Sequence, residues 1–157
     1  MSDTSVKTRH PRLRRLFEYW NERRGTRNFP ARGDIDPLDI SYLMGDIMLV
    51  EVVGEPARFR VRLHGTNLAI RAGYDLTGKY LDDIPYPKYR AYVIERCQGL
   101  VAEGKPLALV HDREVDGRVW HYEALWLPLG HDARTPNMLL CALVYLDEAA
   151  IRREMEG

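Results

Sequence analysis

The chain has 157 residues, of which 45% are hydrophobic and 29% charged, a composition typical of one soluble domain with one core. Its 23 Lys and Arg balance its 23 Asp and Glu, so the net charge gives no support to a protein that binds nucleic acid or a membrane surface. The longest apolar run, 138–146, is too short for a membrane span, and residues 1–15 lack the apolar core of a secretory signal, so we expect a cytoplasmic protein.

The N-terminal region is basic: residues 1–34 hold nine Lys or Arg against four Asp or Glu, and residues 35–157 carry the opposite excess. Such an arm either binds nucleic acid or anionic lipid, or folds back on its own acidic domain. The apolar spacing favours folding back, because it predicts a helix at 11–24, within an N-terminal helix and loop at 11–34, after a disordered basic tail at 1–10. The apolar face of this helix, which we expect to form an interface, holds Leu13, Leu16, Phe17 and Trp20.

A short helix and two strands follow. Asp36 is a good N-cap for a helix at about 37–43. The apolar run at 47–53 predicts a strand. Residues 58–64 alternate between apolar and polar side chains, with three arginines and His64 on one face, which is typical of a half-buried strand at a sheet edge.

Helices occupy the middle of the chain. Thr66 is the expected cap of a short helix that ends at Gly73. An irregular segment at 74–86 leads to a longer amphipathic helix at 87–103, which ends before a glycine.

Asp116-Gly117 is a strong signal for a two-residue hairpin turn. In the register that this turn imposes, His111 faces Tyr122 and Asp112 faces His121. One face of the hairpin is aromatic, and we expect it to look into the core. The other face is acidic, and we expect it to be solvated or to lie at an interface. The aromatic face includes His111, Trp120 and Tyr122, and the acidic face includes Asp112, His121 and Glu123.

The last strand, 138–146, is apolar on both faces, so it belongs in the centre of a sheet that is covered on both sides. Helices within 66–103 can cover one face. The helix at 11–24 is the candidate for the other face, either on its own sheet or on the equivalent face of a partner copy. Hairpins at both ends with helices between them indicate an antiparallel α+β sheet. A short C-terminal helix at 148–157 is expected to follow.

Several blocks of this sequence resemble the PAS domain family, in particular its stand-alone PAS-like branch in alphaproteobacteria. The most specific block is RFRVRLHGTNLAIRAGYDLTGKYLDDI (58–84), and FPARGDIDPLDI (29–40), LFEYWNERRG (16–25) and LPLGHD (127–132) support it. The resemblance implies a PAS-like five-stranded antiparallel sheet of order 2-1-5-4-3 at 35–147, with helices on one face. It also implies a sensory or regulatory module that forms a homodimer and binds a small molecule or a signalling protein.

The sequence argues against the two cofactors that some PAS domains hold. Flavin-binding photosensors carry a reactive cysteine in an Asn-Cys-Arg-Phe-Leu-Gln block, whereas Cys97 stands in Glu-Arg-Cys-Gln-Gly. Haem-binding members usually use a histidine on the helix before the third strand, and 87–103 contains none. The two cysteines and five histidines show no metal-ligand spacing, so no metal site is predicted.

A small organic ligand is expected between the sheet and the helices at 66–103. Aromatic walls with a few polar tips suit a small, partly apolar molecule such as a carboxylate. The alternative is that the same side chains only fill the core. The predicted ligand-binding residues are His111, Trp120, Tyr122, Tyr74, Tyr86 and Tyr89.

The alternative function is a small α+β enzyme that uses His111, or the Asp112–His121 pair, as its acid and base. In the predicted register neither Ser nor Cys lies near these groups to serve as a nucleophile. A cross-strand ion pair on a solvated face is the favoured explanation of the Asp112–His121 pair. We therefore predict no catalytic residues and no enzymatic activity.

Overall fold

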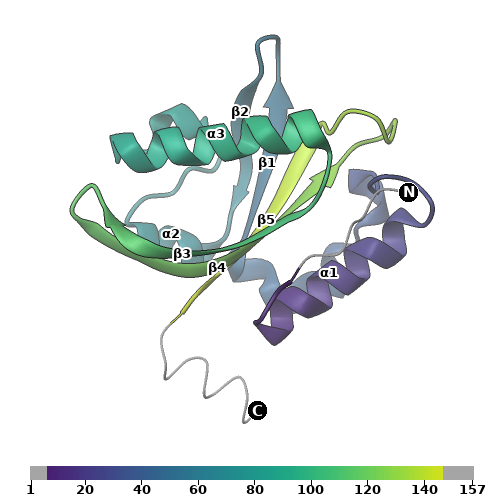
Figure 1. Ribbon diagram of the computed structural model, residues 1–157, viewed down its shortest axis with the longest axis horizontal. Coiled ribbons are helices and arrows are strands. Elements are labelled where there is room, and N and C mark those ends of the chain that lie inside the picture. Colours follow the sequence, from purple (N-terminus) through teal and green to yellow (C-terminus); the bar gives the residue numbers. More distant parts are fainter. Residues whose placement is uncertain (1–6, 147–157) are drawn as a thin grey trace.

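Five antiparallel strands form one sheet in the computed structural model, which describes residues 7–146 (Figure 1). Their order, β2-β1-β5-β4-β3, agrees with the order that the PAS resemblance implies, and β5 lies in the centre. The predicted C-terminal helix at 148–157 falls outside the described residues. The strands are β1 (Ile47–Val53), β2 (Arg58–His64), β3 (Leu107–Val115), β4 (Arg118–Leu129) and β5 (Met138–Tyr145).

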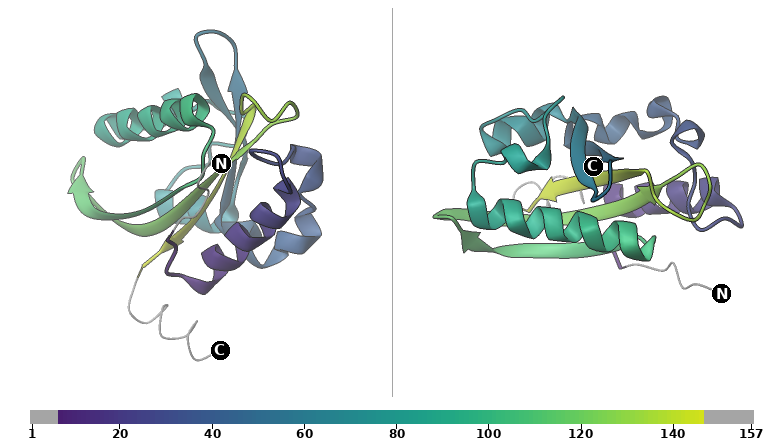
Figure 2. Two further views of the ribbon diagram at one scale, coloured as in Figure 1. Left: turned by 45° about the vertical axis from the view of Figure 1, so that its right-hand side comes forward. Right: turned by 90° about the horizontal axis from the view of Figure 1, so that it is seen from above.

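Helices cover both faces of this sheet (Figure 2). The face beneath α3 is called the inner face here, and the face beneath α1 the outer face. The α-helices are α1 (Pro11–Arg24), α2 (Thr66–Ala72) and α3 (Pro87–Glu103), and the 3-10 helices are η1 (Arg32–Asp34), η2 (Pro37–Asp46) and η3 (Leu81–Asp83).

The hairpin of β3 and β4 has the predicted register. Val115 pairs with Arg118, and the pairing continues to Leu107 and Trp126. Asp116 and Gly117 both have positive φ, 57° and 73°, as a two-residue turn that follows the twist of the strands requires. The register places the aromatic face of the hairpin on the inner side of the sheet.

On the outer face, α1 packs against its own sheet, which decides between the two expected alternatives. Leu13, Leu16 and Trp20 are fully buried in the single chain, and the Trp20 indole N–H donates to the Pro128 carbonyl at 3.0 Å. These three side chains are therefore not available to a second copy. Phe17 is half-buried and stacks on Trp20.

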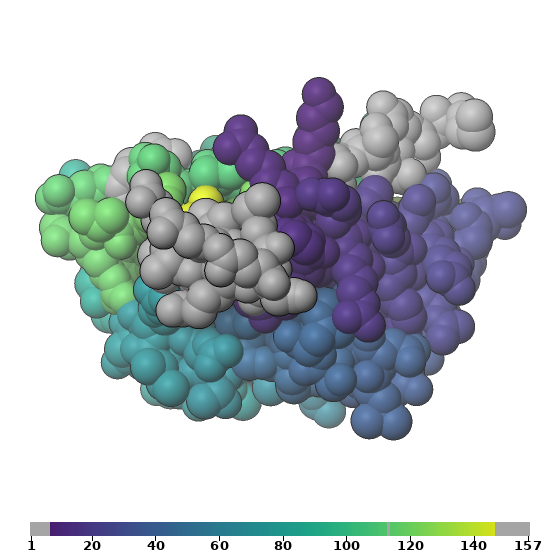
Figure 3. Space-filling model, turned by 90° about the horizontal axis from the view of Figure 1, so that it is seen from below, coloured from purple at the N-terminus to yellow at the C-terminus, as the bar shows by residue number. Residues whose placement is uncertain are grey.

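Two of the five basic residues of α1 are paired with acids that follow the helix in the chain. Arg12 Nη1 lies 3.0 Å from Asp46 Oδ2, and Arg23 Nη2 lies 3.4 Å from Asp39 Oδ2. Figure 3 shows α1 (purple) running beside the blue segment that contains η2. The arm thus folds back on its own domain, as the apolar spacing favoured.

Two helix starts differ from the prediction. The expected disordered tail at 1–10 is too long, because His10 is 5% exposed and its Nδ1 accepts the Arg12 N–H as the cap of α1. The cap of α2 is Gly65 and not Thr66. A side chain at Gly65 would place its Cβ 2.4 Å from the Gly45 carbonyl oxygen, so the close approach of two backbone segments sets this boundary.

Candidate functional site

A cavity of about 60 Å³ lies between the inner face and the helices α2 and α3. The strands supply its floor and Tyr89 and Val93 of α3 its roof, with Tyr74 from the segment after α2 at one side. Among the side chains that the structure describes, no Asp, Glu, Lys or Arg lines it. The cavity therefore offers aromatic surface and neutral polar groups. Its aromatic lining residues are His64, Tyr74, Tyr89, Trp120, Tyr122, Trp126 and Tyr145.

Two buried tyrosines form the polar centre of the cavity wall. The hydroxyls of Tyr89 and Tyr122 share a hydrogen bond of 3.0 Å. The Tyr89 ring also stacks on Trp120 with 3.7 Å between centroids and 6° between planes. Burial raises the pKa of Tyr89 and the pKa of Tyr122 far above the ordinary tyrosine value, so both hydroxyls stay neutral.

His111 lies behind this wall and does not line the cavity. It is 2% exposed and stacks on Tyr122, with 5.1 Å between centroids and 15° between planes. Its Nδ1 is 3.4 Å from the Trp120 carbonyl oxygen. The Tyr92 ring packs against the His111 ring in a T-shaped arrangement, with 5.1 Å between centroids. His111 is thus placed to support Tyr122 from behind, which differs from its predicted position in the pocket.

Tyr74 and Tyr86 lie at the rim. Tyr74 lines the cavity, and burial raises its pKa to about 12. Tyr86 stands outside it, edge-on to Trp120 at 5.6 Å. Arg118 joins the rim to α2: its guanidinium donates to the carbonyls of Ala72 and Arg71 and to the Tyr86 hydroxyl, and lies 4.7 Å from the Trp120 ring centroid.

Of the six predicted ligand-binding residues, the structure brings four to the cavity. Tyr74, Tyr89, Trp120 and Tyr122 line it, whereas His111 and Tyr86 contact those four from outside. The prediction missed His64 and Tyr145, which also line it.

His64 is the one histidine of the cavity wall. It stands at the end of β2, where its Nδ1 accepts the backbone N–H of Leu76 at 3.1 Å. The proton of the neutral ring is therefore on Nε2, which makes that atom a donor. Desolvation by burial lowers the pKa of His64, although Asp75, 3.9 Å away, opposes the shift.

The model of the PAS domain family matches residues 8–144. The chain belongs to the PAS domain family. No curated protein matches it. Its fold is similar to that of the PAS domain of BvgS from Bordetella pertussis, with a TM-score of 0.54, 17% identity, and coverage of 78% of this chain and 96% of that one.

Two further solved structures are similar at lower scores. A domain of an HTR-like protein from Haloarcula marismortui gives a TM-score of 0.45 at 18% identity, over 64% of this chain and 96% of that one. A light-oxygen-voltage domain studied with a flavin analogue gives 0.48 at 10% identity, over 74% and 88%.

The turn of the β3–β4 hairpin in this PAS domain also fixes the start of α3. One carboxylate oxygen of Asp116 accepts the backbone N–H groups of Lys88 and Tyr89, both at 3.0 Å. A carboxylate at a helix N-terminus satisfies free donors and complements the helix dipole. Asp116 thereby ties the roof of the cavity to the tip of its floor.

The acidic side of the hairpin divides into an exposed and a buried part. Asp112 and His121 lie 3.1 Å apart, and Asp112 is largely exposed whereas His121 is partly buried. Glu123, further along β4, is only 2% exposed. Its Oε1 accepts the backbone N–H groups of Arg9 and His10, at 2.8 and 3.0 Å. Glu123 therefore anchors the start of α1 to the sheet, a role that its place on the acidic face did not reveal.

Within residues 7–146, no group of three His, Cys, Asp or Glu side chains is placed to hold a metal ion. Cys97 and Cys141 are free and buried in the inner core, and burial raises the pKa of each thiol well above its ordinary value. In the same described part of the chain, every helix is too short or too polar to cross a bilayer.

Proposed function

We propose that this PAS domain is a non-enzymatic sensory or regulatory module that binds a small neutral organic molecule in its inner cavity. The observation that carries the proposal is the described lining: tyrosine hydroxyls and a histidine, and no charged side chain among the described residues. Burying a charged ligand there would cost desolvation without a counter-charge. The lining supports a neutral ligand over the carboxylate that the sequence suggested.

The size of the cavity limits the ligand. Sites for drug-sized molecules measure roughly 300–1,000 Å³, whereas this cavity measures about 60 Å³. We therefore propose a ligand of a few heavy atoms, and neither flavin nor haem. The hydroxyls of Tyr89 and Tyr122 would orient its polar group, and the face of Trp120 would contact its apolar part.

The candidate catalytic groups support a non-enzymatic role. His111 is enclosed by Tyr122, Tyr92 and Tyr89. The Asp112–His121 pair stands on an open sheet surface, not in a cleft where a substrate would converge with it.

We also propose that the module acts in the cytoplasm as a homodimer and signals to a protein partner. The outer surface of the β3–β4 hairpin supports this proposal, because Val110 and Val119 are 46% and 68% exposed there. They flank the Asp112–His121 pair on the same face. This surface replaces the buried face of α1 as the candidate interface.

Native mass spectrometry of the purified chain, compared with denaturing conditions, tests ligand and dimer together. We expect a dimer mass and a retained small molecule that Tyr122→Phe loses. Tyr42→Phe is the matched control, because it removes a buried hydroxyl that makes no hydrogen bond. If the wild-type chain retains nothing and no small neutral compound raises its melting temperature, the ligand proposal is wrong. A turnover abolished by Asp112→Asn would contradict the non-enzymatic role.

A further inference from the structure

A second cavity, of about 100 Å³, lies on the outer face between η2 and the sheet. Its walls are aliphatic and come from η2 and four strands, with Ile40, Leu63, Leu129 and Leu140 among them. The less buried lining residues are Arg32, Pro37, Met44 and Leu63, which mark its mouth. The sheet separates this cavity from the aromatic inner one.

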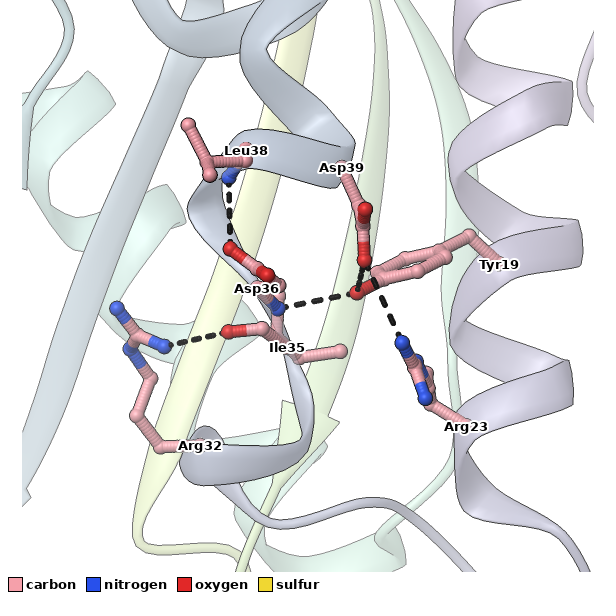
Figure 4. Close-up of polar contacts among 7 residues, drawn as sticks. All are labelled: Tyr19, Arg23, Arg32, Ile35, Asp36, Leu38 and Asp39. Carbon is pink, nitrogen blue, oxygen red and sulfur yellow. Dashed lines mark hydrogen bonds and ion pairs between the residues drawn. The ribbon is translucent and has the colours of Figure 1, made fainter.

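Arg32 is the only charged residue among the described residues of the lining. Its guanidinium donates from Nη1 to the Ile35 carbonyl oxygen at 3.0 Å (Figure 4). Within residues 7–146 no carboxylate forms an ion pair with it. That hydrogen bond uses only one of the five N–H donors of the guanidinium. The positively charged group at the mouth can therefore bind an anion.

The acids nearest to Arg32 in the sequence are engaged elsewhere. Asp34 pairs with Arg27 at 2.9 Å and accepts the Ala31 N–H. Asp36 caps η2 through the Leu38 N–H. Asp39 accepts from the Tyr19 hydroxyl and from Arg23, as Figure 4 shows. These contacts fix the loop around Arg32 and leave its charge uncompensated.

We propose that this outer cavity binds a short aliphatic carboxylate, with its chain among the aliphatic walls and its carboxylate on Arg32. A guanidinium matches a carboxylate through two parallel hydrogen bonds. The described aliphatic walls have no polar side chain that could bond a hydroxyl or amide group on the hydrocarbon tail of the ligand. A polar tail would therefore lose its hydrogen bonds to water without gaining others. Since a cavity of ~150 Å³ accepts benzene, about four carbon atoms beyond the carboxylate fit here.

Isovalerate is the probe that tests this site in the full chain, and isovaleramide is its neutral isostere. We expect isovalerate to bind at least about tenfold more tightly than the amide, since hydrogen bonds to charged groups are the stronger ones. Arg32→Gln should weaken isovalerate binding by a similar factor. Arg62→Gln should leave it unchanged, because that arginine is exposed on β2 and outside the lining.

Nuclear Overhauser contacts locate the bound probe. We expect contacts between the isovalerate methyls and the methyls of Ile40 and Leu140, and none with the ring protons of Tyr89. The proposal is wrong if the wild-type chain binds no isovalerate, if acid and amide bind equally, or if the contacts are to tyrosine rings. The acid–amide comparison needs only the wild-type chain, so it decides even if Arg32→Gln does not fold. A binder at the inner cavity would be a separate result, since it concerns the other face.

Discussion

The two faces of the sheet are built on different principles, and β4 shows both. Toward the inner face it carries Trp120, Tyr122 and Trp126, and toward the outer face Leu125, Leu127 and Leu129. The outer residues need only apolar neighbours, which α1 supplies. The inner residues carry hydroxyl and indole groups that also need hydrogen-bond partners. The same strand thus supports a packing layer on one side and a layer able to recognise polar atoms on the other.

The largest expected effect tests the outer face as a packing layer. Trp20→Ala removes a fully buried indole and its hydrogen bond to Pro128, and should lower the free energy of unfolding by ~3–5 kcal/mol. Urea unfolding followed by circular dichroism measures this. Phe17→Ala is the control, because Phe17 is half-buried and should cost clearly less. A loss below that of Phe17→Ala would show that the Trp20 indole is not buried against the sheet.

The next largest effect concerns Glu123, a buried carboxylate on the otherwise apolar outer face. Glu123→Ala leaves the backbone N–H groups of Arg9 and His10 without their acceptor, and because the His10 bond is buried this should cost ~1–3 kcal/mol of unfolding free energy. Glu123→Gln keeps an oxygen at that position and should cost less. Hydrogen exchange at the start of α1 should accelerate in the alanine variant. Equal stability of the two variants would mean that the acceptor oxygen is unimportant.

On the inner face, the expected loss of unfolding free energy is smaller. Tyr89→Phe and Tyr122→Phe each remove one partner of the hydroxyl pair, for ~1 kcal/mol. Because both changes break the same bond, the double variant should cost less than the sum of the single variants. Strict additivity in the double-mutant cycle would show that the two hydroxyls do not interact.

The smallest effect is a pH dependence. Burial lowers the pKa of His64 in the folded chain, whereas an unfolded histidine titrates near ~6.5. The unfolded chain therefore binds the proton more readily, so stability is complete above about pH 6.5 and falls as the pH drops through the folded-state value. Melting temperatures at pH 7.5 and 5.5 should differ more for the wild type than for His64→Gln. An equal difference would contradict the assignment.

The fold was largely predictable because its signals are local or depend on simple periodicity. Asp116-Gly117 sets the hairpin register, the two-faced apolar pattern of 138–146 requires a central strand, and the apolar stripe of 11–24 requires a sheet to cover. The strand order itself came from the family resemblance, since periodicity does not state which strands are neighbours.

The candidate site was predictable only in part, because contacts between distant segments decide the rest. Strict alternation put His64 on the exposed arginine face of β2, but the β1–β2 register shifts between Leu49 and Val50, and His64 is buried where it accepts the Leu76 N–H. Glu123 looked like part of a solvated face until the start of α1, 113 residues away, covered it. The local sequence pattern around His64 and around Glu123 does not indicate either contact.

The double hydrogen bond of Asp116 has a mechanical consequence. The hairpin turn is hydrogen-bonded to the first residues of α3. The helix above the inner cavity and the strands below it are therefore connected at that end of α3. A movement of α3 away from the sheet that keeps these bonds would be largest at the opposite end of the helix, which is followed by Gly104 in a left-handed conformation. A bound molecule that pushes on Tyr89 would then transmit its force to the hairpin, and not dissipate it in a loop.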